Sequence, residues 1–200
     1  MNTIQLVRFP VCGGPTLEEA ITRRRSRREY SGDLMSLDEL SRLLQYSAGV
    51  TDRRTGSRAA PSAGATYPIE TYAVVNNVES VRAGIYHYLV PSHELDLVRE
   101  GHVQREMSNA ALGERMLLEA NVVLVLSAVY KRTERRYRER AKRYIHFEAG
   151  HIAQNVYLVA TAMGLGTCAV GAFYDEDMNN VLGLDGQEES VLYLLPVGEI

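Results

Sequence analysis

The stretch YIHFEAGHIAQNVYLVATAMGLGTCAVGAF, residues 144–173, decides the fold. Its apolar side chains at positions 145, 149, 152, 156, 159 and 163 are spaced 4, 3, 4, 3 and 4 residues apart. This spacing predicts one apolar face of a long helix, because such positions share a side of a 3.6-residue turn. Gly164 and Gly166 predict the end of that helix, and residues 167–170 then predict a short strand.

The rest of the chain alternates helical and strand patterns. Thr16 with Glu19, and Ser36 with Glu39, form two capping boxes that predict helix starts. By hydrophobic period and turn residues, we expect helices at 103–119 and 176–182, strands at 69–75, 84–89, 94–98, 122–126 and 191–196, and a loop at 49–66. This mixture predicts an α+β protein, with one antiparallel or mixed sheet flanked by helices. A chain of 200 residues fits a single domain over residues 1–200.

The composition excludes several classes of protein. Hydrophobic residues at 46% and charged residues at 24% are typical of a globular chain. A net charge of -3 argues against a whole-protein binder of nucleic acid or anionic membranes. The only two cysteines, Cys12 and Cys168, cannot form a disulfide framework. No apolar run reaches the roughly 18 residues that span a bilayer. Arg8 and Pro10 interrupt any signal peptide, so we expect a cytoplasmic protein.

A basic segment, Arg24-Arg25-Ser26-Arg27-Arg28, lies near the end of the first expected helix. Arg24 and Arg28 are four residues apart and would project on one side if they are helical. Two guanidinium groups and the Ser26 hydroxyl match a phosphate ester, because bidentate charge-assisted hydrogen bonds combine strength with geometry. The alternative is a solvated helix end, where arginines oppose the negative end of the helix dipole.

Two further segments are rich in small residues, which allow a backbone to approach a flat ligand closely. The first is Pro61-Ser62-Ala63-Gly64, which precedes a strand and could equally be a flexible loop. The second is Ala169-Val170-Gly171-Ala172, after the long helix. Packing alone could require small residues there, and Gly164 is explained as a helix cap.

Taken in order, these segments resemble the nitroreductase family, and most closely its SagB-type branch of thiazoline and oxazoline dehydrogenases. PSAGATYPIE at 61–70 is similar to that branch's PSAGALYPIE, and GIYHY at 84–88 to its GLYHY. AGHIAQN at 149–155 is similar to its AGHxAQN. The resemblance covers nearly the whole chain. It implies a nitroreductase-like fold and a domain-intertwined homodimer with FMN at the subunit interface.

The resemblance also implies which residues bind FMN. The phosphate is assigned to Arg24 and Arg28, and polar contacts to the ribityl chain and ring edge to Arg25 and Ser26. The loop that reaches FMN from the partner subunit is assigned to Pro61, Ser62, Ala63 and Gly64. The segment beside the isoalloxazine ring is assigned to Ala169, Val170, Gly171 and Ala172.

Two departures from the family pattern matter. Many nitroreductases place a basic residue after the last strand, whereas this sequence ends in Gly198-Glu199-Ile200, so we expect a heavier dependence on Arg24 and Arg28. The azoline oxidases carry a Lys-Tyr pair where this chain has Arg136-Tyr137. Arginine stays charged and cannot accept a proton. Tyr137 is therefore predicted to be the catalytic residue, as a hydrogen-bond donor or weak acid, unless the pair lies on a solvated helix face.

We therefore expect an FMN-dependent oxidoreductase that transfers a hydride through flavin N5 between NAD(P)H and a small electron-poor acceptor, such as a nitroaromatic or a quinone. The alternatives are an azoline dehydrogenase in peptide modification, a flavin-binding protein without turnover, and a nucleic-acid binder. The last rests on 13 of the 22 basic residues falling in 23–28 and 131–143, but Glu134 and Glu139 interrupt the second cluster. No metal is expected, since His146 and His151 are five apart on a helix and diverge.

Overall fold

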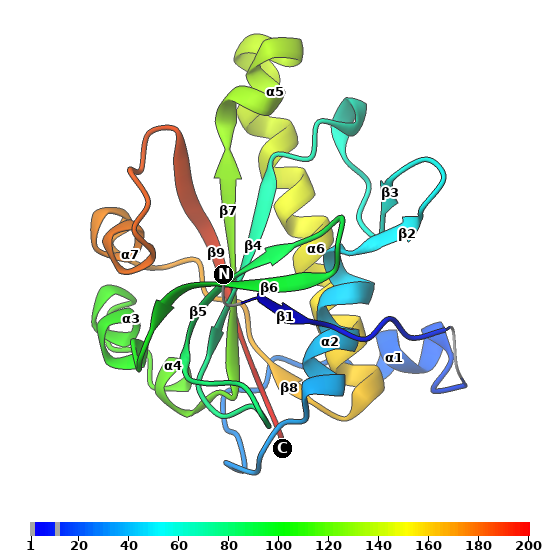
Figure 1. The fold of residues 1–200 in the computed structure, drawn as a ribbon, viewed down its shortest axis with the longest axis vertical. Coiled ribbons are helices and arrows are strands. Elements are labelled where there is room, and N and C mark those ends of the chain that lie inside the picture. Colours follow the sequence, from blue (N-terminus) through cyan, green and yellow to red (C-terminus); the bar gives the residue numbers. More distant parts are fainter. Residues whose placement is uncertain (1–2, 11–12) are drawn as a thin grey trace.

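The computed structural model describes residues 3–10 and 13–200, so Cys12 lies outside the described residues. A seven-stranded sheet of order β1-β6-β5-β4-β7-β9-β8 runs through it (Figure 1), and each of its pairings is antiparallel. Its strands are β1 (Thr3–Gln5), β4 (Ile69–Val75), β5 (Gly84–Leu89), β6 (Glu94–Glu100), β7 (Val122–Val129), β8 (Gly166–Thr167) and β9 (Glu189–Gly198). The α+β architecture predicted from the sequence is thus observed, with the antiparallel form of the sheet.

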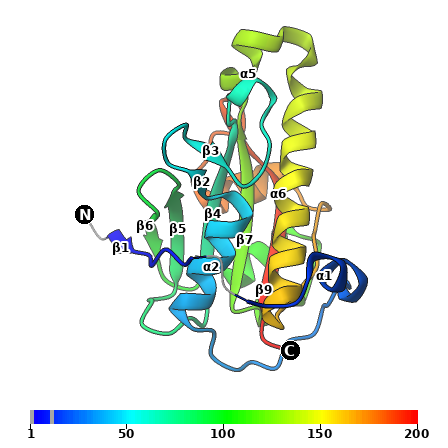
Figure 2. The same ribbon diagram turned by 90° about the vertical axis from the view of Figure 1, so that its right-hand side faces the viewer.

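Helices cover both faces of the sheet. The described helices are α1 (Leu17–Arg23), α2 (Leu37–Ala48), α3 (Gln104–Ala110), α4 (Met116–Glu119), α5 (Tyr130–Tyr137), α6 (Ala141–Met163) and α7 (Asp175–Leu182). In Figures 1 and 2, α2 and α6 lie on one face and α3, α4 and α7 on the other. No helix within the described residues is both long and apolar enough to cross a membrane.

A hydrophobic core lies on each face of the sheet, and successive side chains of the central strands point alternately into one core and the other. On β7, Val122, Leu124 and Leu126 pack into the core beneath α2 and α6. Val123 and Val125, which point to the opposite face, join the core beneath α3, α4 and α7. A strand buried on both faces therefore appears in the sequence as a continuous apolar run, because both sets of side chains must be apolar.

Two helix starts agree with the sequence, whereas the strands expected at 94–98, 122–126 and 191–196 are longer than expected. Both capping boxes are present, at Thr16 and at Ser36. The expected helix 103–119 is wrong as one element: it breaks between α3 and α4, where Leu112 and Gly113 adopt φ of 58° and 83°. Left-handed residues cannot continue a right-handed helix.

The regions expected at 49–66 and 167–170 also differ. The stretch 49–66 contains a hairpin of β2 (Val50–Asp52) and β3 (Ser57–Arg58), followed by a 3₁₀ turn, η1 (Ala63–Ala65). The strand expected at 167–170 pairs only at β8 and, separately, at Val170, which bridges Leu194. The small residues between these pairings leave the sheet.

Candidate functional site

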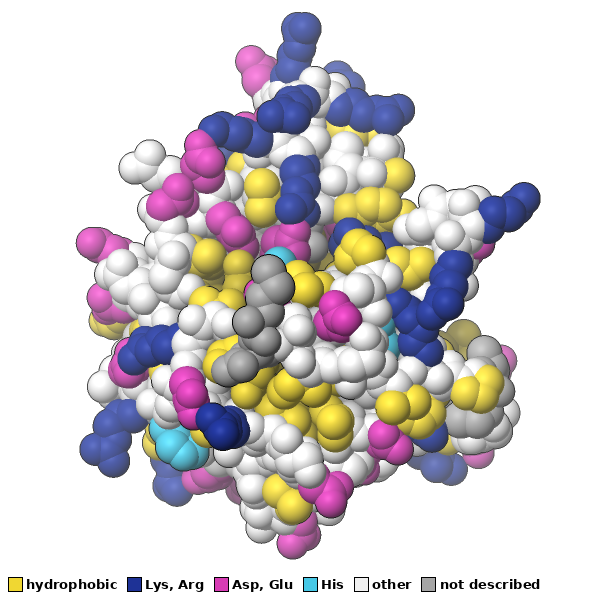
Figure 3. Space-filling view, viewed as in Figure 1, with side chains coloured by type: hydrophobic (Ala, Val, Ile, Leu, Met, Phe, Trp, Pro, Cys, Tyr) yellow, Lys and Arg dark blue, Asp and Glu magenta, His cyan; other side chains and the backbone are white. Residues whose placement is uncertain are grey.

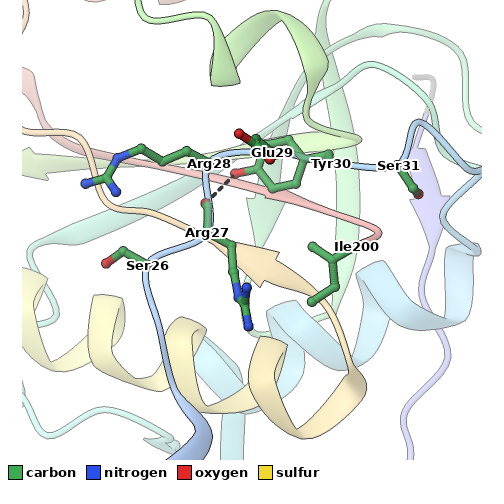
Figure 4. A pocket seen from close by; sticks show the side chains of 7 residues that line it. All are labelled: Ser26, Arg27, Arg28, Glu29, Tyr30, Ser31 and Ile200. Carbon is green, nitrogen blue, oxygen red and sulfur yellow. Dashed lines mark hydrogen bonds between the residues drawn. The ribbon is translucent and has the colours of Figure 1, made fainter.

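The basic segment after α1 is extended, which corrects the expectation that Arg24 and Arg28 share a helix face. The helix ends at Arg23, and Arg24 is its cap with φ of -50° and ψ of 125°. Ala20 is the buried residue of α1, and the next positions on its side are Arg23 and Arg24, so no apolar side chain holds a further turn. In an extended chain alternate residues share a side. Figure 4 shows the side chains of Ser26 and Arg28 directed to one side and that of Arg27 to another.

Tyr157, on α6, joins this segment to the small-residue segment after β8. Its hydroxyl lies 3.2 Å from Ser26 Oγ and accepts a hydrogen bond of 2.8 Å from the Ala169 N–H. The Arg24 guanidinium carbon lies 5.3 Å from the centre of the same ring, within cation–π range. Sequence reasoning missed Tyr157, although a tyrosine near the apolar face of a long helix was a visible indication.

Backbone contacts hold the two segments together more closely. The Arg27 N–H donates to the Thr167 carbonyl at 2.9 Å. A Cβ on Gly166 would lie 2.5 Å from Ile200 Cγ2 and 3.0 Å from Arg27 Cβ, so only glycine allows this approach. Residues 26–31 and Ile200 line a hollow of about 580 Å³ (Figure 4).

The charges at this end of the molecule are unevenly paired. Within the described residues, neither Arg24 nor Arg28 has a carboxylate within ion-pair distance. Arg25 Nη1 instead donates to the carbonyls of Thr22 and Arg24, at 2.9 and 2.7 Å. The segment therefore offers two guanidinium groups to a ligand, while Arg25 satisfies the carbonyls at the end of α1.

Residues 169–172 lie beside β9, and their last two residues are exposed and unpaired with any strand of the described chain; we call residues 169–172 the open edge. Val170 exchanges two backbone hydrogen bonds with Leu194, of 2.8 and 3.0 Å. Gly171 and Ala172 are exposed, and among the described residues the Gly171 N–H has no acceptor. A Cβ on Gly171 would meet the Tyr193 ring at 3.6 Å, an ordinary contact. Burial raises the pKa of Tyr193, so its hydroxyl stays protonated.

The Pro61–Gly64 loop lies elsewhere, against the end of α5. Gly64 has φ of 60°, and a Cβ there would lie 2.8 Å from both Arg136 Nε and Tyr137 Oη. Arg136 Nη1 donates to the Gly64 carbonyl at 3.1 Å. Ser62 Oγ accepts a hydrogen bond of 2.8 Å from the Tyr67 N–H. The structure thus places the loop beside the Arg136-Tyr137 pair.

Tyr137 is half-buried and Arg136 is exposed. The Tyr137 ring packs against Tyr144 with centres 4.6 Å apart, and its hydroxyl end faces Gly64. The pair therefore does not lie wholly on a solvated helix face. The helix α5 ends at Tyr137, and the next residue, Arg138, has a φ of 48°.

A buried carboxyl group supports the same loop from below. Glu148, on α6, is only 4% exposed, and it contacts the Ser62 hydroxyl and the Ile69 N–H. Burial raises the pKa of Glu148 to about 7, against the lowering effects of Ser62, Arg58 and Ile69. Glu148 belongs to the helix stretch that also contains His146 and His151, but its side chain is turned into the core toward Ser62.

His146 of that stretch and two residues of the basic cluster, Lys131 and Arg132, have partners within the described part of the chain. His146 is exposed and its Nδ1 lies 2.6 Å from the Lys142 carbonyl oxygen. Lys131 forms an ion pair with Glu188, and Arg132 forms one with Glu70. Figure 3 shows lysine and arginine side chains gathered at the top of the view, where α5 lies, together with acidic ones.

The candidate residues therefore form two groups in one chain. Ser26 and Ala169 meet at Tyr157, whereas Ser62 meets Glu148, nine residues earlier on α6, or about 13 Å along the helix axis at 1.5 Å per residue. Figures 1 and 2 show the chain after α1 and the loop after β3 toward opposite ends of α6. One chain does not bring all three predicted segments together.

Comparison with known proteins identifies the family. Residues 21–199 match the model of the nitroreductase family. A protein of Methanocaldococcus jannaschii assigned as a nitroreductase is 45% identical, over 91% of this chain and 90% of its own length. The trifolitoxin-processing protein TfxB of Rhizobium leguminosarum bv. trifolii is 34% identical, over 79% of this chain and 46% of its own. This chain therefore spans about half the length of TfxB.

A solved structure is also similar to this chain. The Escherichia coli microcin synthetase complex McbBCD, with truncated pro-microcin bound, superposes with a TM-score of 0.79 and 25% identity. That match covers 96% of this chain and 75% of the other. The antiparallel sheet flanked by helices is thus the nitroreductase-like fold, as the motifs at 61–70, 84–88 and 149–155 predicted, and this chain belongs to the nitroreductase family.

Proposed function

We propose that this chain is an FMN-dependent oxidoreductase that passes a hydride between NAD(P)H and a small electron-poor acceptor, such as a nitroaromatic or a quinone. The observation that carries the proposal is the junction at Tyr157. It brings the arginine segment and the open edge at residues 169–172 to one place from positions far apart in the chain. Family membership supports the oxidoreductase class.

The residues present fit the phosphate of FMN. Arg24 and Arg28 lack carboxylate partners among the described residues. Arg24 and Ser26 both contact Tyr157, and Figure 4 shows Ser26 and Arg28 directed to one side. A phosphate monoester carries a charge near -2 at neutral pH, which two guanidinium groups and a hydroxyl match. Polar contacts of Arg25 to FMN remain a prediction. Its Nη1 already donates hydrogen bonds to two carbonyls at the end of α1.

The edge at 169–172 fits the flat part of the cofactor. Gly171 and Ala172 are small and exposed, and the Gly171 N–H is a donor without a partner in the described part of the chain. FMN, when bound, supplies the two-electron hydride chemistry at N5. The chain's own task is to orient the rings with fixed donors and to leave one ring face open for a substrate.

We further propose that the site is completed in a homodimer by Pro61, Ser62, Ala63 and Gly64 of a second copy. Two observations support this. The loop and the arginine segment lie toward opposite ends of α6 within one chain. On α1, Leu17 and Ile21 are one turn apart and remain 62% and 54% exposed, an apolar pair that a second copy would cover. We place this dimer in the cytoplasm.

The test begins with an absorbance spectrum of the purified protein and an anaerobic titration with NADH and NADPH. We expect a yellow protein whose flavin bands bleach. Replacing Arg24 or Arg28 by alanine should each weaken FMN binding by about 1.5–3 kcal/mol, the scale of hydrogen bonds to charged groups. Exposed Arg105 on α3 is the matched control, and Arg105→Met should bind FMN normally. Tight FMN binding that survives loss of both Arg24 and Arg28 would contradict the phosphate assignment.

A second candidate function is the dehydrogenation of azoline rings in a peptide, favoured by the similarity to TfxB and to the microcin synthetase complex. Aromatisation needs a proton acceptor near the ring. Tyr137 faces the Pro61–Gly64 loop, but Arg136 beside it cannot serve as a base. The wild type, Tyr137→Phe and Arg136→Lys should therefore be compared with a nitroaromatic and an azoline peptide. Fast azoline oxidation by the wild type, with no gain from Arg136→Lys, would favour this second function.

A further inference from the structure

A separate cavity of about 410 Å³ lies behind the Pro61–Gly64 loop. Its polar side chains come from four elements and the loop: Arg58 of β3, Tyr67, Glu70 of β4, His87 of β5 and Arg132 of α5. Residues 88–91 form the remaining wall, with the apolar side chains of Leu89 and Val90 among them. None of these residues belongs to the proposed flavin site.

The one carboxylate of the cavity is already fully engaged. Glu70 is mostly buried, and its Oε2 lies 2.7 Å from His87 Nε2 while its Oε1 forms an ion pair with Arg132. Burial alone would raise the pKa of Glu70, but the hydrogen bond from His87 and the charge of Arg132 outweigh it and hold that pKa below its usual value. Glu70 is therefore ionised, and each of its two oxygens already has a partner.

Arg58 is a half-buried cation without a matching anion. Among the described residues no carboxylate lies within ion-pair distance of it, and its guanidinium stacks 4.3 Å from the centre of the Tyr67 ring. Desolvation lowers the pKa of Arg58, although guanidinium remains charged near neutral pH. The charges of Glu70 and Glu148 both act on Arg58 and raise its pKa, but Glu70 is already paired with Arg132, and a Glu148 carboxyl with a pKa of about 7 is only half ionised near neutral pH.

The charge balance of the cavity is thus positive. Arg132 and Glu70 cancel, and Glu148 offsets only part of the charge on Arg58. An uncompensated, partly desolvated charge is costly, and an anionic ligand removes that cost. The planar guanidinium can bind two oxygens of a carboxylate or of a phosphate in parallel, so the apolar wall of the cavity is what favours an organic acid. The apolar wall accommodates an organic body.

We propose that this cavity binds a small organic carboxylate, with Arg58 as its anchor. The occupant would contact Tyr67, which belongs to the same connection as Ser62 and Gly64. Arg132 holds that connection through a hydrogen bond of 2.9 Å to the Tyr67 carbonyl. A carboxylate bound here would therefore restrain the loop from the side opposite Tyr137. The proposal does not depend on the flavin, because its residues lie outside the Arg24–Arg28 segment.

The test measures thermal unfolding and calorimetric binding of the purified protein with sodium benzoate, and with sodium phosphate or sodium chloride at matched ionic strength. Benzoate at ten times its Kd should raise Tm by about 3 °C or more, as linkage predicts for a chain of this size. Arg58→Met should weaken benzoate binding at least tenfold, and Arg58→Lys by less. Arg105→Met removes one exposed charge elsewhere and should bind benzoate normally.

One further variant separates this site from the flavin site. The double variant Arg24→Ala/Arg28→Ala should keep benzoate binding if the cavity is the site. Loss of benzoate binding in that variant and not in Arg58→Met would overturn the proposal, and would mean that the anion binds at the arginine segment. Equal stabilisation by phosphate and benzoate, or none beyond that of chloride, would also overturn it.

Discussion

The two ends of α6 carry the two halves of the proposed site, and they are built in opposite ways. At the Tyr157 end, chain segments near positions 26 and 169 meet through side-chain and backbone hydrogen bonds. At the Glu148 end, a single continuous loop is held in shape by the helix beside it. The first half is therefore a product of the tertiary fold, whereas the second is a local structure that faces outward.

Backbone strain is distributed in the same unequal way. The Pro61–Gly64 loop and the residues that follow it contain three positive φ values, of 60° at Gly64, 52° at Ala65 and 44° at Tyr67. Residues 24–31 contain none. Left-handed alanine and tyrosine cost about 1 kcal/mol or more each and persist only where surrounding contacts impose them. Arg136 of the same chain holds Gly64 through a hydrogen bond to its carbonyl, and a loop fixed in this way is compatible with the proposed homodimer.

The strongest way to break this comparison is a mixed dimer. Arg24→Ala/Arg28→Ala disables one half of the site, and Gly64→Val disables the other by driving a side chain into Arg136 and Tyr137. Each pure dimer should lose about 100-fold or more in NADH oxidation, since the arginine pair alone is worth about 3–6 kcal/mol. A purified heterodimer with one copy of each should recover about half of the wild-type rate, because one of its two sites is intact.

The heterodimer is isolated with two different affinity tags, and a heterodimer of wild type with each variant serves as the control. If both halves came from the same chain, every site in the mixed dimer would carry one defect. Activity would then stay at the level of the pure variants, and the assignment of the loop to the partner subunit would be wrong.

A matched pair of glycine substitutions sharpens the comparison of the two ends. Gly64→Ala combines a left-handed φ with contacts of 2.8 Å and should destabilise the fold by about 2–3 kcal/mol. Gly171→Ala meets only the Tyr193 ring at 3.6 Å and should change the free energy of unfolding by less than about 0.5 kcal/mol. Urea denaturation measures both, and equal effects would show that the loop is not constrained by α5.

The sequence predicted the fold better than the site for a physical reason. The strands at 69–75 and 84–89 were predicted with their observed ends, because alternation and flanking turn residues are local properties. The helix at 103–119 was not, since two left-handed residues depend on packing. Because arginine is a good helix former, the sequence left open whether Arg24 and Arg28 belong to the first helix, which ends at Arg23.

The site itself rests on contacts across long chain separations. That Tyr157 joins positions 26 and 169, or that Glu148 lies beneath Ser62, follows from the antiparallel order of the strands and the place of α6 on the sheet. No periodicity encodes these contacts. Which segments belong to one site was therefore inferred from the family resemblance, and the structure separates them into two groups.

The Glu148 end should also respond to pH. The folded pKa of about 7 lies above the usual 4.5 of glutamate, so the native state holds the proton more tightly. The stabilising contribution is full below pH 4.5 and is lost as pH rises through 7, by about 3 kcal/mol. Glu148→Gln removes the titration, so the variant should gain on the wild type by that amount between pH 4.5 and 8.

The quantity to measure is the difference in unfolding free energy between the wild type and Glu148→Gln, because buried His93 has the opposite dependence on pH. Desolvation lowers the pKa of His93, so its contribution is lost as pH falls and cancels when variant and wild type are compared. A difference in unfolding free energy that stays constant from pH 4.5 to 8 would mean that Glu148 is solvated.

A smaller effect than that of Glu148→Gln is expected from Tyr157→Phe, at the other end of α6. The substitution keeps the ring beneath Arg24 and removes only the hydroxyl that meets Ser26 and the Ala169 N–H. Both partners are partly exposed and can turn to water, so the loss should be about 1 kcal/mol of folding stability. Because the hydroxyl fixes the arginine segment against residues 169–172, FMN affinity should fall about fivefold as well.

Tyr144→Phe, at the Tyr137 end of α6, is the control. It removes a hydroxyl that has no hydrogen-bond partner in the described part of the chain and should change neither folding stability nor FMN affinity. Fluorescence titration with FMN decides the matter: unchanged affinity in Tyr157→Phe would mean that the two segments hold their positions through the Arg27–Thr167 backbone contact alone.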